Sequence, residues 1–171
     1  TRGRVDTTLH RAPAEYRCPN PSSGAGGDTG YKLIAYPTIQ FFDGRSASRP
    51  WLQELPDPMT HLCWNGWVEI NPKTAKHLGI AEGDVLQITS PYGSLTIPAF
   101  PYHGVPAGTL AIPIGQWHSA SGRYARGRPA SPAQILPPGP DARSGSMLWS
   151  LSGVTLRKTG GIIPLATTAG S

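Results

Sequence analysis

The stretch that decides the fold is N-P-K-T-A-K-H-L-G-I-A-E-G-D-V, residues 71–85. Asn71 is a typical N-cap residue, Pro72 suits the first position of a helix, and Gly79 suits the left-handed position just past a helix end. These signals predict a two-turn helix between Pro72 and Leu78. The Gly-Asp pair near the end of the stretch predicts a tight turn into a following strand.

Outward from this stretch, apolar runs and period-two alternation predict short β-strands. The predicted strands cover residues 31–36, 67–70, 85–89, 94–99, 109–114 and 154–158. A further helical turn is expected at 51–55, between two prolines. Short strands joined by tight turns favour a closed barrel, because closure removes the exposed edges that proline-rich strands would leave.

The composition excludes several classes of protein. Of 171 residues, 21 are Gly and 19 are Pro, and only 15% are charged, which does not fit a long-helix protein. Glycine does not recur at every third position, as collagen requires, and no run of 18 apolar residues would span a membrane. Five Trp and six Tyr can build a core, so the chain is not fully disordered. We therefore predict a single mainly-β domain.

The ends of the chain and one internal segment differ in composition from the rest. Residues 1–30 have no apolar periodicity and are expected to be a linker or disordered. The barrel is expected to cover 31–160, and 161–171 to be an exit linker. Within the barrel, 115–147 is a long excursion rich in Gly, Pro, Ser and Arg, and a loop of this length is usually functional or disordered.

Charge and cysteine usage limit what the chain can bind. The net charge of +5 permits a cleft for a phosphate-bearing ligand. Aromatic and basic residues do not interleave, so we expect no nucleic-acid partner. His61 and Cys63 form the only close His/Cys pair, so we expect no metal to be ligated by this chain. Whether Cys18 pairs with Cys63 stays open.

Several blocks together resemble a known family. They are W-V-E-I-N-P-K-T-A at 67–75, L-G-I at 78–80, E-G-D-V at 82–85 and V-P-A-G at 105–108. These blocks resemble the C-terminal, molybdopterin-dinucleotide-binding domain of the dimethyl-sulfoxide-reductase family. The resemblance implies a double-psi β-barrel, here with one or two short helices and long Gly/Pro-rich loops. It also implies molybdopterin guanine dinucleotide as the cofactor.

Three further blocks, at 49–58, 115–128 and 156–168, suggest a narrower match. They resemble the fused molybdopterin-oxidoreductase/iron–sulfur subunit of alternative complex III and of polysulfide-reductase-like complexes. The resemblance implies a fragment that is not catalytic alone and that contacts the remaining domains of a parent subunit. That parent would carry the iron–sulfur clusters and take part in quinol-linked electron transfer. It would belong to a membrane-associated bacterial complex, at the periplasmic face, with no direct membrane insertion by this chain.

The resemblance points to two groups of cofactor-binding residues. The first lies in the loop after the first strand and comprises Thr38, Gln40, Arg45 and Ser46. A guanidinium can donate a forked pair of hydrogen bonds to phosphate, and the other three side chains offer neutral polar contacts. The alternative is an ordinary polar loop.

The second group lies in the long excursion and comprises Gln116, His118, Arg123, Tyr124 and Ser131. A histidine can donate to a pterin nitrogen or carbonyl. Ser131 stands before a proline, where family members that bind the pterin usually carry Asn. The alternative is that His118 packs against a neighbouring domain.

Two readings of the function stay open within the family, and one outside it. The domain either binds the dinucleotide or retains only the shape that once bound it. Outside the family, it is a stand-alone double-psi barrel, such as a pyruvoyl decarboxylase-like enzyme or a substrate-binding module. The decarboxylase needs a Gly-Ser processing site, and Gly93-Ser94 and Gly145-Ser146 are the candidates.

Overall fold

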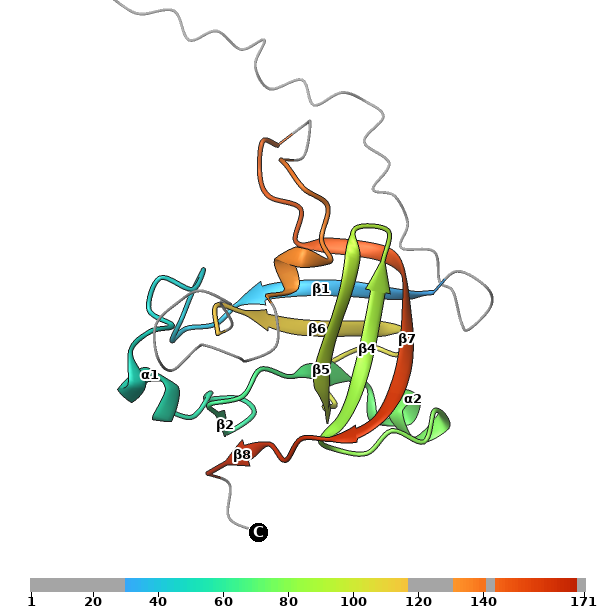
Figure 1. The fold of residues 1–171 in the computed structure, drawn as a ribbon, viewed down its shortest axis with the longest axis horizontal. Coiled ribbons are helices and arrows are strands. Elements are labelled where there is room, and N and C mark those ends of the chain that lie inside the picture. Colours follow the sequence, from blue (N-terminus) through green and yellow to red (C-terminus); the bar gives the residue numbers. More distant parts are fainter. Residues whose placement is uncertain (1–29, 117–130, 141–143, 169–171) are drawn as a thin grey trace, which may run out of the picture.

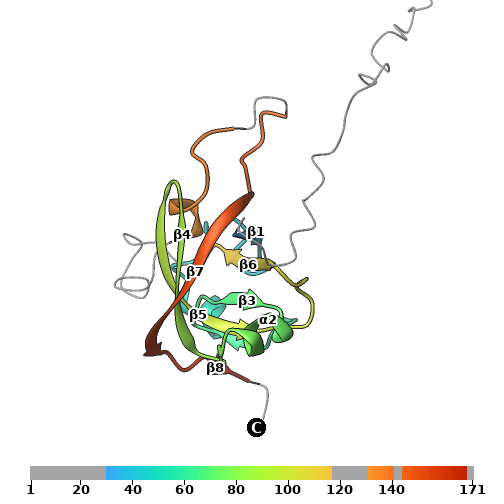
Figure 2. The same ribbon diagram turned by 90° about the vertical axis from the view of Figure 1, so that its right-hand side faces the viewer.

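The computed structural model describes residues 30–116, 131–140 and 144–168. Its barrel strands are β1 (Tyr31–Pro37), β3 (Val68–Ile70), β4 (Asp84–Ser90), β5 (Gly93–Pro101), β6 (Thr109–Ile114) and β7 (Ser150–Ile162). They close into a barrel in the order β1-β6-β3-β5-β4-β7 (Figures 1 and 2). The other elements are α1 (Pro50–Glu54), α2 (Pro72–His77), the 3-10 helix η2 (Pro132–Gln134), and a two-stranded sheet of β2 (Leu62–Cys63) and β8 (Ala166–Thr167). The predicted mainly-β, double-psi barrel is confirmed.

Helix α2 forms where its local signals predict it. The Asn71 side chain accepts a hydrogen bond from the Lys73 amide at 3.0 Å, as an N-cap does. The side-chain nitrogen of Asn71, Nδ2, also donates to the carbonyl of Val105 at 2.7 Å, and this bond attaches the start of the helix to the loop before β6. Gly79 follows the helix at φ 64°, a conformation that glycine adopts without strain.

The C-terminal part of the fold differs from the prediction. Strand β7 runs from Ser150 to Ile162, well beyond the predicted 154–158, because it pairs with β1 at one end and with β4 at the other. Much of it is exposed, so its apolar alternation is weak. Residues 161–168, the described part of the segment expected to be an exit linker, are attached to the fold as well, since the Thr168 amide donates to the carbonyl of His61 at 3.1 Å. Two-residue strands such as β2 and β8 carry no periodicity that a sequence could reveal.

Two buried layers lie on opposite faces of the strands. Leu33, Val68 and Ile70 belong to the cluster that fills the barrel. Successive side chains of a strand point to opposite faces, so Glu69 lies on the outer face. Residues 38–66 cover this outer face, where the second layer comprises Phe41, Ala47, Leu62 and Trp67, all nearly inaccessible to solvent. We call residues 38–66 the outer lobe. In the described part of the chain, no helix is long and apolar enough to cross a membrane.

Strands β1 and β6 pair in parallel, with Pro37 opposite Ile114. The chain leaves both strands at the same edge, and Gly115 there packs against the loop that follows β1. A Cβ on Gly115 would lie 2.7 Å from the Cβ of Phe41 and 3.2 Å from the amide nitrogen of Gly44. Gly115 also has φ 103°, so glycine is required on two grounds.

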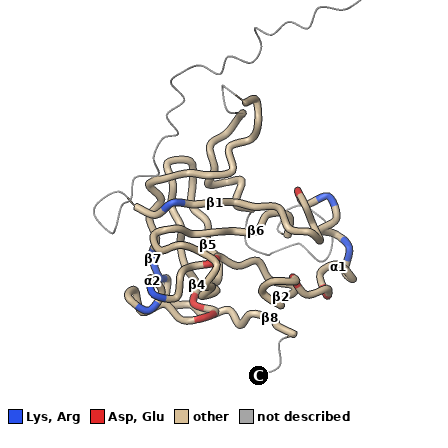
Figure 3. Tube along the Cα trace, turned by 180° about the vertical axis from the view of Figure 1, so that it is seen from behind, with Lys and Arg blue, Asp and Glu red and all other residues tan. Residues whose placement is uncertain are grey.

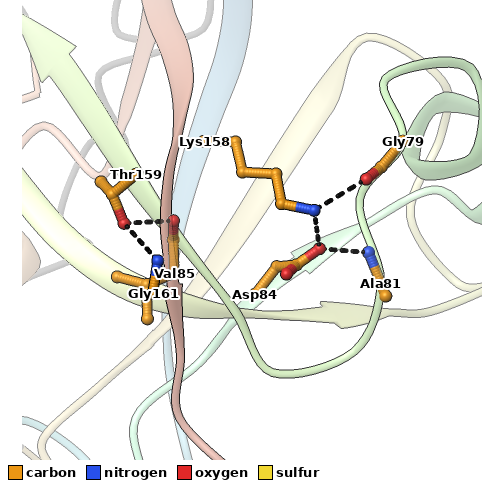
Figure 4. Close-up of polar contacts among 7 residues, drawn as sticks. All are labelled: Gly79, Ala81, Asp84, Val85, Lys158, Thr159 and Gly161. Carbon is orange, nitrogen blue, oxygen red and sulfur yellow. Dashed lines mark hydrogen bonds and ion pairs between the residues drawn. The ribbon is translucent and has the colours of Figure 1, made fainter.

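An ion pair joins β7 to the turn after α2 (Figure 4). The Lys158 ammonium lies 2.6 Å from Oδ2 of the buried Asp84 and donates to the carbonyl of Gly79 at 3.0 Å. The Ala81 amide donates to the same carboxylate oxygen at 2.6 Å. The hydrogen bond from Lys158, followed by that from Ala81, lowers the pKa of Asp84. The pair therefore fixes one end of the long strand.

Replacing Lys158 by Met should weaken this attachment while keeping the aliphatic stem. We expect a loss of about 1 kcal/mol in the free energy of unfolding at pH 7, since Lys158 is partly exposed. The folded-state pKa of Asp84 lies below its unfolded value of about 4, so the stabilisation is present above that pH and is lost as the pH falls through the folded-state pKa. Urea titrations at several pH values measure both effects. Arg157→Met, an exposed neighbour on the same strand, is the matched control, and an equal loss in both variants would contradict the assignment.

Replacing Gly115 by Ala should test the packing at the β1–β6 edge. Gly139 has nearly the same φ, 102°, but a Cβ there would meet nothing within 4 Å. Gly139→Ala therefore carries only the backbone strain, whereas Gly115→Ala also forces the Phe41 loop to move. We expect Gly115→Ala to lower the free energy of unfolding by about 1–3 kcal/mol more than Gly139→Ala. Equal losses would show that Gly115 does not pack on that loop.

Candidate functional site

The candidate site is the β1–β6 edge, which we define as residues 38–47 together with Gly115 and Gln116. Parallel pairing brings the ends of β1 and β6 together, although the two segments are far apart in the sequence. The edge lies next to α1, at the end of the barrel opposite α2 (Figure 1). The structure thus brings the Thr38–Ser46 group and Gln116 to one place.

Gln116 is the most informative residue of the edge. Its side chain is buried, and its Oε1 has no hydrogen-bond partner among the described residues. A buried amide oxygen without a partner costs about 1–3 kcal/mol, so native structures rarely leave one unpaired without a reason. An acceptor of this kind fits a ligand that presents an N–H donor.

The side chains of Thr38 and Gln40 serve the loop itself. Thr38 is buried, and its hydroxyl oxygen accepts from the Phe41 amide at 3.2 Å. The Gln40 side chain donates to the carbonyl of Leu55 at 2.9 Å, which attaches the loop to the end of α1. Ser46 accepts at its backbone carbonyl from the Arg49 amide at 3.1 Å. These contacts give the loop a defined shape.

The guanidinium of Arg45 is already engaged. It donates to both carboxylate oxygens of Asp43, at 2.9 and 2.7 Å, and lies 5.1 Å from the centre of the Phe42 ring. The hydrogen bonds from Arg45 hold the pKa of Asp43 well below its usual range. Binding of a phosphate by Arg45 would therefore require this exposed pair to open.

The remaining predicted residues are placed elsewhere or are not described. Ser131 caps η2, with its hydroxyl accepting from the Ala133 amide at 3.4 Å. Helix η2 lies beside the β4–β5 turn, where Ser90 donates to the carbonyl of Ile135 at 2.7 Å. No hydrogen bond among the described residues joins Ser131 to the 38–47 loop. His118, Arg123 and Tyr124 fall outside the described residues.

A buried polar cluster beneath the edge was not predicted. The Tyr36 hydroxyl donates to Oε1 of Glu69 at 2.6 Å, and the Trp67 indole donates to the same oxygen at 3.2 Å. Burial, the largest cause, raises the pKa of Glu69. Burial followed by the Glu69 charge raises the pKa of Tyr36 far above its usual value, so Tyr36 remains a donor. The signal available in the sequence was a glutamate at the centre of a strand with apolar neighbours.

Metal ligands do not gather in the described part of the chain. Within residues 30–116, 131–140 and 144–168, no three His, Cys, Asp or Glu side chains lie together as a metal ion would need. His61 and Cys63 belong to the loop and strand of the outer lobe, and the Cys63 thiol lies 3.7 Å from the carbonyl of Ala166.

The arrangement resembles that of known proteins at several levels. In three dimensions, the chain is similar to acetylene hydratase from Pelobacter acetylenicus, with a TM-score of 0.55. The likeness covers 75% of this chain and 18% of that one at 19% sequence identity, so it supports the fold alone.

Curated relatives match at higher identity over shorter stretches. The molybdopterin-containing subunit ArrA of the arsenate respiratory reductase of Shewanella sp. (strain ANA-3) is 43% identical over 84 residues, 48% of this chain and 10% of its own length. The menaquinone reductase molybdopterin-binding-like subunit of Nitratidesulfovibrio vulgaris is 30% identical over 93 residues, 54% of this chain and 14% of its own length. The chain thus spans only a small part of these relatives.

A family model covers more of the chain. The model of the molydopterin dinucleotide binding domain matches residues 39–145, which include all but the first residue of the outer lobe, β3 to β6 and η2. This match favours the family named by the sequence blocks over the other double-psi barrels. The chain belongs to the molybdopterin dinucleotide binding domain family, and the two relatives described above are named as reductase subunits, one molybdopterin-containing and one molybdopterin-binding-like.

Proposed function

We propose that the β1–β6 edge binds molybdopterin guanine dinucleotide as one wall of a site in a larger oxidoreductase. The larger protein would take part in quinol-linked electron transfer and would hold its iron–sulfur clusters outside this chain. Its other domains, and through them the subunits of a membrane-associated redox complex at the periplasmic face of a bacterium, would be the partners. The name of the arsenate respiratory reductase subunit, which is molybdopterin-containing, supports the cofactor.

The buried oxygen of Gln116 carries this proposal. The guanine and pterin rings both present N–H groups, and a donor of this kind would restore the hydrogen bond that Oε1 lacks among the described residues. The residues present therefore fit one part of such a ligand. The close contact of Gly115 with the Phe41 loop keeps the next residue, Gln116, near residues 38–47.

The other residues would bind and orient the ligand. Thr38, Gln40 and Ser46 shape the loop, and Arg45 would contact a phosphate if its pair with Asp43 opened. Ser131 and the undescribed His118, Arg123 and Tyr124 remain candidates from the family resemblance. When bound, the cofactor supplies the redox-active metal, and this chain would supply only binding and orientation, with no catalytic group of its own.

A second candidate is a barrel that keeps the shape of the site without the cofactor. The observation that favours it is the closed Asp43–Arg45 pair, which leaves the loop without a free cation for a phosphate. The menaquinone reductase relative, whose subunit is named molybdopterin-binding-like, fits this candidate. In that case the domain would be architectural.

Metal and pterin analysis of the full-length protein separates the two candidates. We expect molybdenum or tungsten by mass spectrometry, and a fluorescent pterin after oxidation, in near-stoichiometric amounts. We expect Gln116→Met to lower pterin occupancy by roughly tenfold under subsaturating supply, the effect of losing one hydrogen bond of about 1–1.5 kcal/mol. Gln134→Met, an exposed glutamine on η2, is the control and should leave occupancy unchanged. Absence of both metal and pterin from the wild-type protein would overturn the first candidate and support the second.

A further inference from the structure

Helix α1 buries a polar side chain and exposes an apolar one, which is the reverse of the usual arrangement in a surface helix. Gln53 is 5% exposed, whereas Trp51, on the other side of the same helix, is 66% exposed. The Gln53 side chain donates to the carbonyl of Ala47 at 2.9 Å, and its backbone carbonyl accepts from the Trp64 amide at 2.9 Å. A surface helix normally turns its apolar side chains inward. Here hydrogen bonds hold the inner side of α1, and the tryptophan faces outward.

The outward side of this lobe exposes further large apolar side chains, together with charged ones such as Asp43, Arg45 and Glu54. Ten large hydrophobic side chains are exposed in the described part of the chain, and half of them come from the segment 39–59. They are Ile39 (88% exposed), Phe42 (57%), Trp51 (66%), Leu55 (52%) and Met59 (69%), which we call the α1 face. The hydrogen bond from Gln40 to the carbonyl of Leu55 holds the two halves of this segment together. Concentrated exposed apolar surface usually marks an interaction site.

Local contacts hold part of the α1 face in a defined conformation. Phe42 is held at φ 50°, an uncommon conformation for a residue with a side chain, and the guanidinium of Arg45 lies over its ring. Arg45 is fixed in turn by Asp43. A face that is already ordered loses less conformational entropy on docking than a flexible one. Figure 3 shows lysine and arginine residues beside α1 and near α2, and also on strands β1 and β7.

The size of the relatives indicates what covers this face. This chain corresponds to 10% of the arsenate respiratory reductase subunit and to 14% of the menaquinone reductase subunit. Burying a large apolar side chain contributes about 1.5–3 kcal/mol, so leaving five of them in water would be a substantial loss of stability. The outer lobe already packs its inner side on the barrel.

We propose that the α1 face docks onto an apolar surface of the remaining part of the polypeptide that contains this chain. The proposal rests on the proposed function only in placing this domain within a larger protein, and it does not require the cofactor to be bound. Because the 38–47 loop belongs both to the α1 face and to the β1–β6 edge, docking would also fix the shape of that edge.

Oxidative footprinting of the full-length protein tests the proposal. The chain contains two methionines, Met59 in the α1 face and Met147 outside it, with exposed fractions of 69% and 49%. Trp51 and Trp149, at 66% and 37%, form a second matched pair. We expect Met59 and Trp51 to react with hydroxyl radicals roughly tenfold more slowly in the folded protein than in the same protein in denaturant. Rates for Met59 and Trp51 equal to those of the denatured protein would overturn the proposal.

Three controls identify what covers the face. The first control is protein from a host that cannot make molybdopterin. If Met59 and Trp51 are protected from oxidation to the same extent in this protein, docking is supported, even if cofactor binding fails. If they are protected only when the cofactor is present, the docking proposal is overturned. Protection that disappears on dilution points to a second copy of the protein and also overturns it. Trp51→Lys should raise the oxidation rate of Met59 several-fold, whereas Ile162→Lys, at a similarly exposed site on β7 (73% against 66%), should not. If Trp51→Lys does not fold, the wild-type rates still decide the question.

Discussion

The candidate site depends on the parallel pairing of β1 with β6. This pairing places Pro37 opposite Ile114, so the loop that leaves β1 and the loop that leaves β6 begin at the same edge of the barrel. Gly115 then allows the two loops to approach to contact distance, because a side chain there would collide with Phe41. Gln116 follows directly and is buried with an unpaired oxygen. A polar group that no described residue satisfies is thereby held at the edge where we propose that the ligand binds.

A hydrogen bond across β6 reinforces the same arrangement. Strand β6 lies between β1 and β3, yet the Tyr36 hydroxyl reaches Glu69 on the outer face. Tyr36 is the residue before Pro37, so this bond fixes the end of β1 just before the candidate loop. Trp67 donates to the same carboxylate oxygen and is itself buried beneath the outer lobe. The buried cluster thus connects the barrel, the lobe and the β1–β6 edge.

Features set by local sequence signals could be predicted from the sequence, whereas contacts between segments far apart in the chain could not. Helix α2 formed as expected because its cap, its proline and its closing glycine all act within one stretch. The paired loops at 38–46 and 115–116 were selected by resemblance, and their meeting point follows from a strand pairing that no local pattern encodes. The engagement of Arg45 by Asp43, and the burial of Glu69 with Tyr36, depend on side-chain geometry. Strands β2 and β8 are too short for any periodicity.

A cryo-electron microscopy structure of the full-length protein, purified with its native cofactor content, tests the central claim most directly. The account predicts density for a pterin dinucleotide against residues 38–47 and Gly115–Gln116, with a ligand nitrogen within hydrogen-bond distance of the Gln116 side-chain oxygen. Density for the dinucleotide at another face of the barrel, or an edge filled by protein side chains that pair with Gln116, would contradict it.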